Sequence, residues 1–260
     1  MTEGIHKTSF LQLQAGVARP IAGTVPVEEE VLLYVNGSEW VALRCTPLLL
    51  EELGLGFLYN EGFIDGMADV AEVRLCGSGR CVDIWLHKDV HPPALRAITS
   101  GCSGGTSFES LVKERSPLTT QVNVTPDQVA ALMQALNKAS QLYRQSRGIH
   151  AAALAESSEL IVVAEDLGRH NTLDKLAGIC LRRGLTTQGR ILLTSGRISS
   201  EMLSKAARME TPVVISRTSP TSFSIELASA WGITLIGYAR GQELHLYTGA
   251  QRLSGIERPG

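Results

Sequence analysis

The segment that decides the fold is Leu160-Ile-Val-Val-Ala-Glu-Asp-Leu-Gly-Arg-His-Asn-Thr-Leu-Asp-Lys175. Residues 160–164 are apolar, rich in β-branched side chains and too few for a helix, which predicts a buried strand. A helix is predicted to follow, with Asn171 as its N-cap. The loop between them contains Arg169 and His170, and at the end of a parallel strand this combination favours an anionic ligand. For the loop alone, a solvated polar turn is the alternative.

The composition of the 260-residue chain is typical of a globular protein, with 44% hydrophobic and 19% charged residues. The formal net charge of −2 gives no chain-wide basic field, so neither nucleic acid nor a membrane is an expected partner. Because the sequence lacks a membrane-spanning apolar run and a signal-peptide pattern, we expect a cytoplasmic protein. The odd number of cysteines argues against a disulfide framework: Cys45, Cys76, Cys81, Cys102 and Cys180.

Residues 1–98 are predicted to form a smaller, β-rich N-terminal domain with one helix. Asn36-Gly37 lies between two strand-like segments and predicts a hairpin. Thr46-Pro47 predicts the N-cap and first turn of a helix over 48–63. Another backbone is expected to pack closely on two glycines inside that helix, Gly54 and Gly56.

Two further strands are predicted on either side of Gly77-Ser78-Gly79-Arg80. Cys76 and Cys81 flank this turn, and His87 and His91 follow the second strand. These residue types are zinc ligands, but a hairpin with two incidental cysteines is the favoured interpretation.

Residues 99–118 are predicted to form a flexible loop that carries Cys102, because Thr99 to Thr106 reads Thr-Ser-Gly-Cys-Ser-Gly-Gly-Thr. A thiol in such a loop can lie beside backbone N–H groups that favour its reactive thiolate form. The alternative is an incidental small residue, but no apolar neighbours surround this cysteine.

Residues 119–260 are predicted to form a three-layer α/β/α domain with a largely parallel sheet, since short strands and helices alternate from His150 onward. Thr125 to Gln128 has the pattern of a capping box at the start of an earlier helix. His150 begins an apolar strand and is more typical of a hydrogen-bonded core histidine than of a ligand.

From the strand predicted at residues 160–164 onward, four successive loops after predicted strands each contain an arginine. The loops are Arg169-His170, Ser195-Gly196-Arg197, Arg217-Thr218-Ser219 and Arg240-Gly241. Because the carboxyl ends of parallel strands meet at one edge, these side chains are expected to converge on a dinucleotide-like or polyphosphate ligand. The sequence contains neither a Walker loop nor a GxGxxG fingerprint.

Four motifs resemble the FdhD family of formate dehydrogenase accessory sulfurtransferases, over nearly the whole chain: Gly56 to Gly62, Gly148 to Ala153, Glu165 to Lys175, and Thr194 to Met202 with Lys205. The resemblance implies a sulfur carrier that receives a persulfide from a cysteine desulfurase. The resemblance further implies that such a carrier delivers the sulfur to the molybdenum or tungsten bis(molybdopterin guanine dinucleotide) cofactor, bound as substrate, before the cofactor enters formate dehydrogenase. It also implies a C-terminal domain like the cytidine deaminase fold, a homodimer, and no permanent metal.

The resemblance also assigns site residues. It makes Cys102 the persulfide cysteine. It places cofactor binding at a six-residue segment: Tyr238, Ala239, Arg240, Gly241, Gln242 and Glu243. Many members of the family have Cys-x-x-Cys in the loop, but here the second position is Gly105, so release of sulfur through a vicinal disulfide is not open to this chain.

Other classes of function remain as alternatives. A cofactor-binding chaperone without persulfide chemistry would need the arginines but not the thiol. A zinc hydrolase of the deaminase type is disfavoured, because the His-x-Glu and Pro-Cys-x-x-Cys patterns are absent. His170 and Glu165 are candidates to orient the cofactor, and structural roles at the helix start are equally consistent with their positions.

Overall fold

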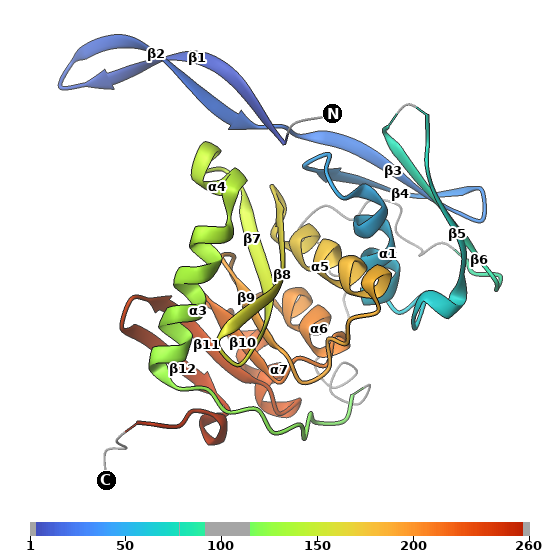
Figure 1. The fold of residues 1–260 in the computed structure, drawn as a ribbon, viewed down its shortest axis with the longest axis vertical. Helices are drawn as coiled ribbons and strands as arrows, with labels where there is room; N and C mark the ends of the chain where they lie inside the picture. Colours follow the sequence, from blue (N-terminus) through green and yellow to red (C-terminus); the bar gives the residue numbers. More distant parts are fainter. Residues whose placement is uncertain (1–3, 78, 92–114, 257–260) are drawn as a thin grey trace.

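The computed structural model describes residues 4–77, 79–91 and 115–256. Figure 1 shows an arm of two strands that projects from the body, a four-stranded sheet beside helix α1 (Leu50–Asn60), and a six-stranded sheet with helices on both faces. Within the described ranges, no helix is long and apolar enough to cross a bilayer.

The four-stranded sheet has the order β4-β3-β6-β5. Its elements, with a short 3-10 helix η1 before β5, are β3 (Glu29–Val35), β4 (Ser38–Cys45), η1 (Met67–Asp69), β5 (Val70–Leu75) and β6 (Cys81–Leu86). The predicted hairpin between β3 and β4 is confirmed, because Asn36 and Gly37 both have the positive φ angles, 50° and 74°, that a two-residue turn requires.

The predicted start of α1 is wrong. The N-cap is Leu49, in the left-handed region at φ 55°, and its side chain makes no capping bond. Thr46 is instead buried, and its hydroxyl accepts a hydrogen bond from the Leu167 N–H at 3.1 Å. Thr46 therefore does not cap the helix. It forms a contact between the N-terminal unit, which contains the four-stranded sheet, and the C-terminal unit, which contains the six-stranded sheet.

Gly56 is in close contact with another backbone, as predicted. A Cβ added to Gly56 would overlap the carbonyl of Asp174 in helix α5 (Arg169–Arg183), and one added to Gly178 would overlap the carbonyl of Glu52 in α1. Gly54 differs, because its neighbours are side chains of the four-stranded sheet. The α1–α5 interface thus joins the N-terminal unit to the C-terminal one.

The six-stranded sheet has the order β12-β11-β10-β9-β7-β8. Its strands are β7 (His150–Glu156), β8 (Glu159–Asp166), β9 (Ile191–Thr194), β10 (Val213–Ser216), β11 (Thr234–Arg240) and β12 (Glu243–Thr248). The prediction of a largely parallel sheet is wrong, because only the β9–β10 and β10–β11 pairs are parallel. A tight turn joins β7 to β8 and makes them antiparallel.

The predicted edge nevertheless exists. Strand β8 is antiparallel to β7, and β7 is antiparallel to β9, so β8 points in the same direction as β9. The carboxyl ends of β8, β9, β10 and β11 therefore lie at one edge of the sheet.

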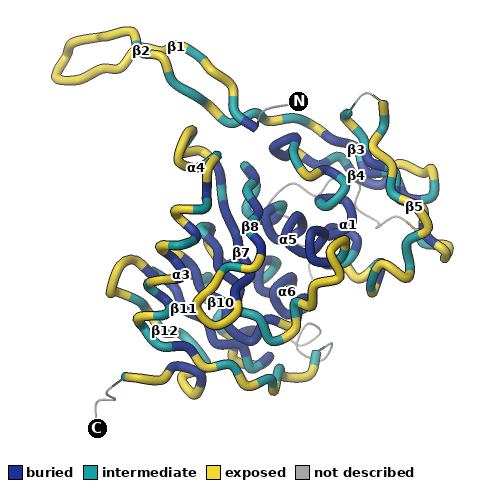
Figure 2. The backbone as a smooth tube through the Cα atoms, in the orientation of Figure 1, coloured by how far each residue is buried: buried dark blue, intermediate teal, exposed yellow. Residues whose placement is uncertain are grey.

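The predicted three layers are confirmed (Figures 1 and 2). Helix α3 and the helix after it, α4, precede the sheet in the chain, and α6 and α7 join α5 on the face opposite α3. Their bounds, with a final 3-10 turn η2, are α3 (Pro126–Ala139), α4 (Gln141–Ser146), α6 (Ser200–Arg208), α7 (Ser222–Ala230) and η2 (Ala250–Arg252). The capping box predicted for the start of α3 is present, with Thr125 and Gln128 exchanging hydrogen bonds.

The cysteines correct a further prediction. Cys76 and Cys81 form a disulfide, because the β5–β6 hairpin brings their Cα atoms to 5.3 Å. The bond occupies both thiols of the zinc alternative, and among the described residues there is no group of three or more potential ligands for a metal ion. Cys45 and Cys180 are buried free thiols. Cys102 lies outside the described residues.

Candidate functional site

Four arginines lie at or just beyond the carboxyl ends of the strands that meet at the common edge: Arg169, Arg197, Arg217, and Arg240, which is the last residue of β11. We call this set the arginine edge. Arg240 Nε donates to the Arg217 carbonyl oxygen at 3.0 Å, and the Arg217 guanidinium donates to the Tyr143 hydroxyl at 3.2 Å. Burial and the charge of Arg197 lower the pKa of Arg169. An anion bound here would relieve the repulsion between these two cations.

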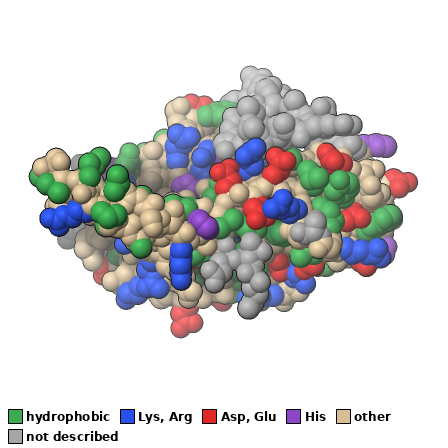
Figure 3. All heavy atoms as spheres, turned by 90° about the horizontal axis from the view of Figure 1, so that it is seen from above, with side chains coloured by type: hydrophobic (Ala, Val, Ile, Leu, Met, Phe, Trp, Pro, Cys, Tyr) green, Lys and Arg blue, Asp and Glu red, His purple; other side chains and the backbone are tan. Residues whose placement is uncertain are grey.

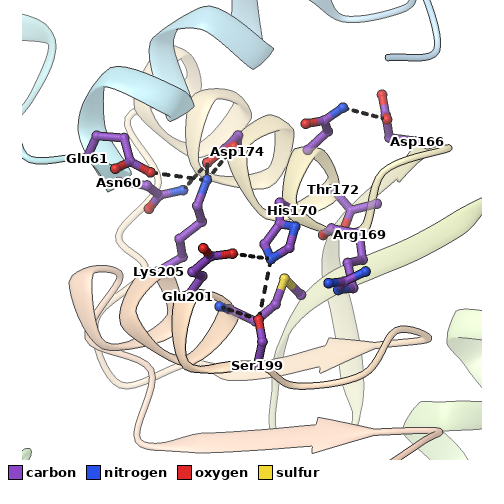
Figure 4. A network of polar contacts seen from close by, with 12 residues as sticks. Asn60, Glu61, Asp166, Arg169, His170, Thr172, Asp174, Ser199, Glu201 and Lys205 are labelled. Atoms are coloured by element: carbon purple, nitrogen blue, oxygen red, sulfur yellow. Dashed lines mark hydrogen bonds and ion pairs between the residues drawn. The ribbon is translucent and has the colours of Figure 1, made fainter. Parts of the chain in front are cut away.

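His170 lies beside Arg169 at the start of α5 and is only 8% exposed. Its Nε2 lies 3.1 Å from Glu201 Oε2 and 3.4 Å from Ser199 Oγ, two groups at the start of α6 (Figure 4). Its Nδ1 is buried, as is Arg169 Nε, and neither atom has a hydrogen-bond partner among the described residues. Buried polar atoms normally have partners, so the orphaned Arg169 N–H indicates a place for an acceptor group. His170 Nε2 donates to the Glu201 carboxylate, so Nδ1 is a second donor only when the ring is protonated.

The N-cap of α5 is Gly168, not Asn171 as predicted. Gly168 supplies no side-chain cap, and Asn171 lies within the first turn. The Asn171 amide instead donates to Asp166 Oδ1 at 2.9 Å and to the carbonyl of Arg44 at 2.8 Å. The uncapped start of α5 leaves its positive dipole end facing the arginine edge.

A buried ion pair, absent from the sequence analysis, holds this loop in place. Lys175 Nζ lies 2.5 Å from Asp166 Oδ2, and both side chains are fully buried. Lys175 also donates to the carbonyl of Thr46 at 2.9 Å, and Asp166 accepts from the Thr46 N–H at 3.1 Å. The β4–α1 connection is thereby bound to the end of β8 and to α5, whose first turn carries Arg169 and His170.

A second buried network lies behind His170 (Figure 4). Lys205 Nζ binds both carboxylate oxygens of Asp174, at 2.7 and 2.6 Å, and Asn60 Nδ2 donates to the same carboxylate at 2.8 Å. Burial lowers the pKa of Lys205, but the carboxylates of Asp174 and Glu61 outweigh it, and the pKa is raised. Lys205 is therefore a charged structural group rather than a base.

Ser195 and Gly196 shape the edge rather than offering free donors. The Ser195 hydroxyl accepts from the Ala151 N–H at 2.9 Å and lies 3.4 Å from His150 Nδ1. A Cβ on Gly196 would lie 2.9 Å from Arg169 Cβ, so this glycine allows the arginine to pack close to the loop. His150 is half-buried and hydrogen-bonded, which agrees with the structural interpretation.

The predicted segment from Tyr238 to Glu243 forms the end of β11, the turn, and the first residue of β12. The Tyr238 N–H donates to the Thr218 carbonyl at 3.1 Å, and the Arg240 guanidinium lies 5.7 Å from the Tyr238 ring centroid. The Ala239 side chain is buried, so it is not available to a ligand. Glu243 contacts His245 at 3.2 Å. Gly241, with φ 59°, and Gln242 form the turn.

Glu165 has a structural role. Its carboxylate accepts from the N–H groups of Leu142 and Tyr143, at 3.1 and 2.9 Å, and so fixes the start of α4. Through Tyr143, which binds Arg217, this helix also lies against the arginine edge.

The described cysteines are not reactive thiolates. Burial raises the pKa of Cys45 to about 12 and that of Cys180 to about 11. Cys180 lines a cavity of about 290 Å³ with Tyr59 and Thr187, and none of the residues that line this cavity belongs to the arginine edge.

His150 makes the stability of the fold depend on pH. Burial and the charge of Arg169 lower its pKa, while Asp166 raises it and His170 lowers it further. Because the unfolded state binds the proton of His150 more tightly, the contribution of the neutral His150 side chain to the free energy of unfolding is fully present above pH 6.5. This contribution is lost as the pH falls below that value. We expect His150→Gln to reduce the loss of melting temperature between pH 7.5 and pH 5.5. An unchanged loss, measured by circular dichroism, would contradict this assignment.

The fold and the site define a class: an α/β protein whose mixed sheet presents a cationic edge, and whose buried ion pairs form hydrogen bonds to Thr46 and Asn60 of an N-terminal β unit. The family model described as the FdhD/NarQ family matches residues 26–254, and the chain belongs to this family. The resemblance noted in the sequence is thereby confirmed.

Similar proteins support the family assignment. The chain is 34% identical to the sulfur carrier protein FdhD of Bacillus subtilis (strain 168) over 249 residues, covering 92% of this chain and 94% of the relative. It is also 34% identical to the protein of the same name from Listeria innocua, covering 96% and 99%. A crystal structure described as a formate dehydrogenase accessory protein, from Desulfotalea psychrophila, matches with a TM-score of 0.81 and 25% identity, covering 96% of this chain and all of that one. The likeness to the cytidine deaminase fold stays a prediction.

Proposed function

We propose that this protein is a sulfur carrier that receives sulfur as a persulfide on Cys102 and delivers it to a bis(molybdopterin guanine dinucleotide) cofactor of molybdenum or tungsten. The donor is a cysteine desulfurase, and the loaded cofactor enters the catalytic subunit of a formate dehydrogenase. The homodimer implied by the family resemblance is part of the same proposal.

The observation that carries the proposal is an orphaned donor at the arginine edge. Among the described residues, the buried Arg169 Nε–H has no hydrogen-bond partner, and it lies at the start of α5, where the N-cap Gly168 makes no side-chain capping bond. The guanine dinucleotide arms of the cofactor carry pyrophosphates, whose oxygens are acceptors for such donors. The donor set therefore fits the cofactor as a bound substrate.

In the first step, the Cys102 thiolate attacks the outer sulfur of the donor persulfide, and the thiolate of the desulfurase leaves. Cys102 then carries the extra sulfur as a persulfide. Its release as sulfide needs two electrons, and position 105 is glycine, so no second thiol of this loop motif is present. An external thiol attacks the Cys102 sulfur and sulfide leaves, while Cys102 and the external thiol are oxidised together to a mixed disulfide. A second external thiol then reduces this disulfide and restores the Cys102 thiol.

The experiment is incubation with a cysteine desulfurase and cysteine, followed by mass measurement of the intact protein. The wild type should gain the mass of one sulfur atom, and Cys102→Ala should gain none. Cys180→Ala is the matched control, since its thiol is buried and protonated. Loading that persists in Cys102→Ala would refute the persulfide step.

A cofactor-binding chaperone is the second candidate, favoured by Gly105 in place of a second cysteine. Cys102→Ser separates the two functions. A chaperone would still support formate dehydrogenase activity in cells that lack their own copy of this protein, whereas a sulfur carrier would not.

Arg169→Met tests the ligand edge directly. Removing the charged donor should weaken the binding of guanosine diphosphate about tenfold, the effect of losing one charge-assisted hydrogen bond. Isothermal titration calorimetry measures the affinity. Arg183→Met, an exposed arginine at the far end of α5, is the control and should bind as the wild type does. Equal affinities for the two variants would contradict the assignment.

A further inference from the structure

The arm that projects from the body consists of β1 (Ile5–Gln14) and β2 (Val17–Pro26), paired residue by residue over their whole length. Ala15 and Gly16, both with positive φ, form the turn at its tip. Each strand spans roughly 30 Å. A two-stranded ribbon is marginally stable alone in water, so an arm of this length is expected to be covered in its working state.

The surface of the arm is apolar and cationic. Leu11 is 65% exposed and Leu13 is 75% exposed on one face, and Phe10 is 46% exposed on the other. Residues 5–26 contain Lys7 and Arg19 but no aspartate or glutamate. Figure 3 shows hydrophobic and cationic side chains along the arm as it extends away from the body. Within the described residues the arm forms a sheet of only two strands, so its two outer edges have no strand paired to them.

The root of the arm lies next to the candidate site. The Thr24 hydroxyl donates to the carbonyl of Gln145 in α4 at 2.6 Å, and Gly148, just after α4, packs closely on Pro26. The same helix carries Tyr143, which binds Arg217 of the arginine edge. Figure 1 shows the arm passing over α4 and outward. A protein bound to the arm would therefore stand beside the edge at which the cofactor is proposed to bind.

We propose that the β1–β2 arm is the docking element for the protein that accepts the cofactor, and that it binds an acidic surface with a free strand edge. Backbone pairing along the arm, its exposed leucines and its two cations would together supply the contact. A second copy of this arm fits less well, because residues 5–26 contain no aspartate or glutamate that could pair with Lys7 and Arg19 of the first. The proposal rests on the proposed function, since the acceptor is the cofactor-free catalytic subunit of a formate dehydrogenase.

The test measures the affinity of the full-length protein for that cofactor-free subunit by biolayer interferometry. Lys7→Glu with Arg19→Glu, and separately Leu11→Ser with Leu13→Ser, should each weaken binding at least tenfold. Arg183→Glu and Leu75→Ser, an exposed cation and an exposed leucine away from the arm, are the matched controls and should change affinity less than twofold. Guanosine diphosphate affinity and persulfide loading should be unaltered in all four variants.

Other outcomes overturn the inference. Unchanged acceptor affinity in both arm variants would exclude the arm as a docking element. A loss of self-association by light scattering, with acceptor binding intact, would make the arm a contact between copies. If the arm variants lose binding to anionic phospholipid vesicles but keep their affinity for the acceptor, the partner of the arm is a membrane.

If the wild type binds the nucleotide and loads sulfur but does not bind the acceptor, the docking proposal fails while the proposed function stands. Loss of nucleotide binding and loading in the wild type would refute the function instead.

Discussion

Lys175→Met is expected to lower the free energy of unfolding by about 3 kcal/mol. The substitution leaves the Asp166 carboxylate fully buried without its ammonium partner and removes the hydrogen bond to the Thr46 carbonyl. Because Asp166 also orders the start of α5, affinity for guanosine diphosphate should fall as well. Urea unfolding followed by circular dichroism measures the first effect, and calorimetric titration measures the second.

The matched control is Lys138→Met, since Lys138 is an exposed lysine in the last turn of α3. It should alter stability by no more than about 0.5 kcal/mol. If Lys175→Met lowered the free energy of unfolding by less than about 1 kcal/mol, the buried ion pair would contribute little to the stability of the protein.

Gly56→Val is expected to destabilise the protein by about 3 kcal/mol, although valine is a better helix former than glycine. Its Cβ would overlap the Asp174 carbonyl, so α1 and α5 must move apart. That movement also disturbs the Asn60–Asp174 hydrogen bond across the same interface. Thermal and urea unfolding measure the loss.

Gly66→Val is the control, because Gly66 has an extended backbone and no atom within 4 Å of an added Cβ. It should leave stability within about 1 kcal/mol of the wild type. If Gly56→Val were as stable as this control, close helix contact would not be what selects glycine there.

The sequence predicted elements best where the signal was local. Asn36-Gly37 specifies a tight turn, and Thr125 with Gln128 specifies a helix start, because each depends only on neighbouring residues. Asn171 and Thr46 carried equally good capping signals and do not cap. Both are used in contacts between units more than a hundred residues apart in sequence, which override the local preference.

The sequence predicted the arginines of the candidate site but not the buried contacts that hold the site in place. Arg169, Arg197, Arg217 and Arg240 stand out because each follows a strand. The His170–Glu201 contact and the Lys175–Asp166 pair left only a weak signal, because a histidine and a lysine within a predicted helix do not show which distant carboxylate they meet. The arm was not predicted from the sequence, because only Leu11-Gln-Leu-Gln14 alternates between apolar and polar residues.

By itself, the sequence determined the class of fold, the family and the placement of an arginine after each strand that ends at the site. These follow from short-range patterns and from the order of residues along the chain. Only the tertiary structure decided that β7 runs against its neighbours, that β8 still points toward the arginine edge, and that Lys175 is buried against Asp166. Strand direction and ion pairing depend on which distant segments meet, and that is set by packing of the whole chain rather than by any local stretch.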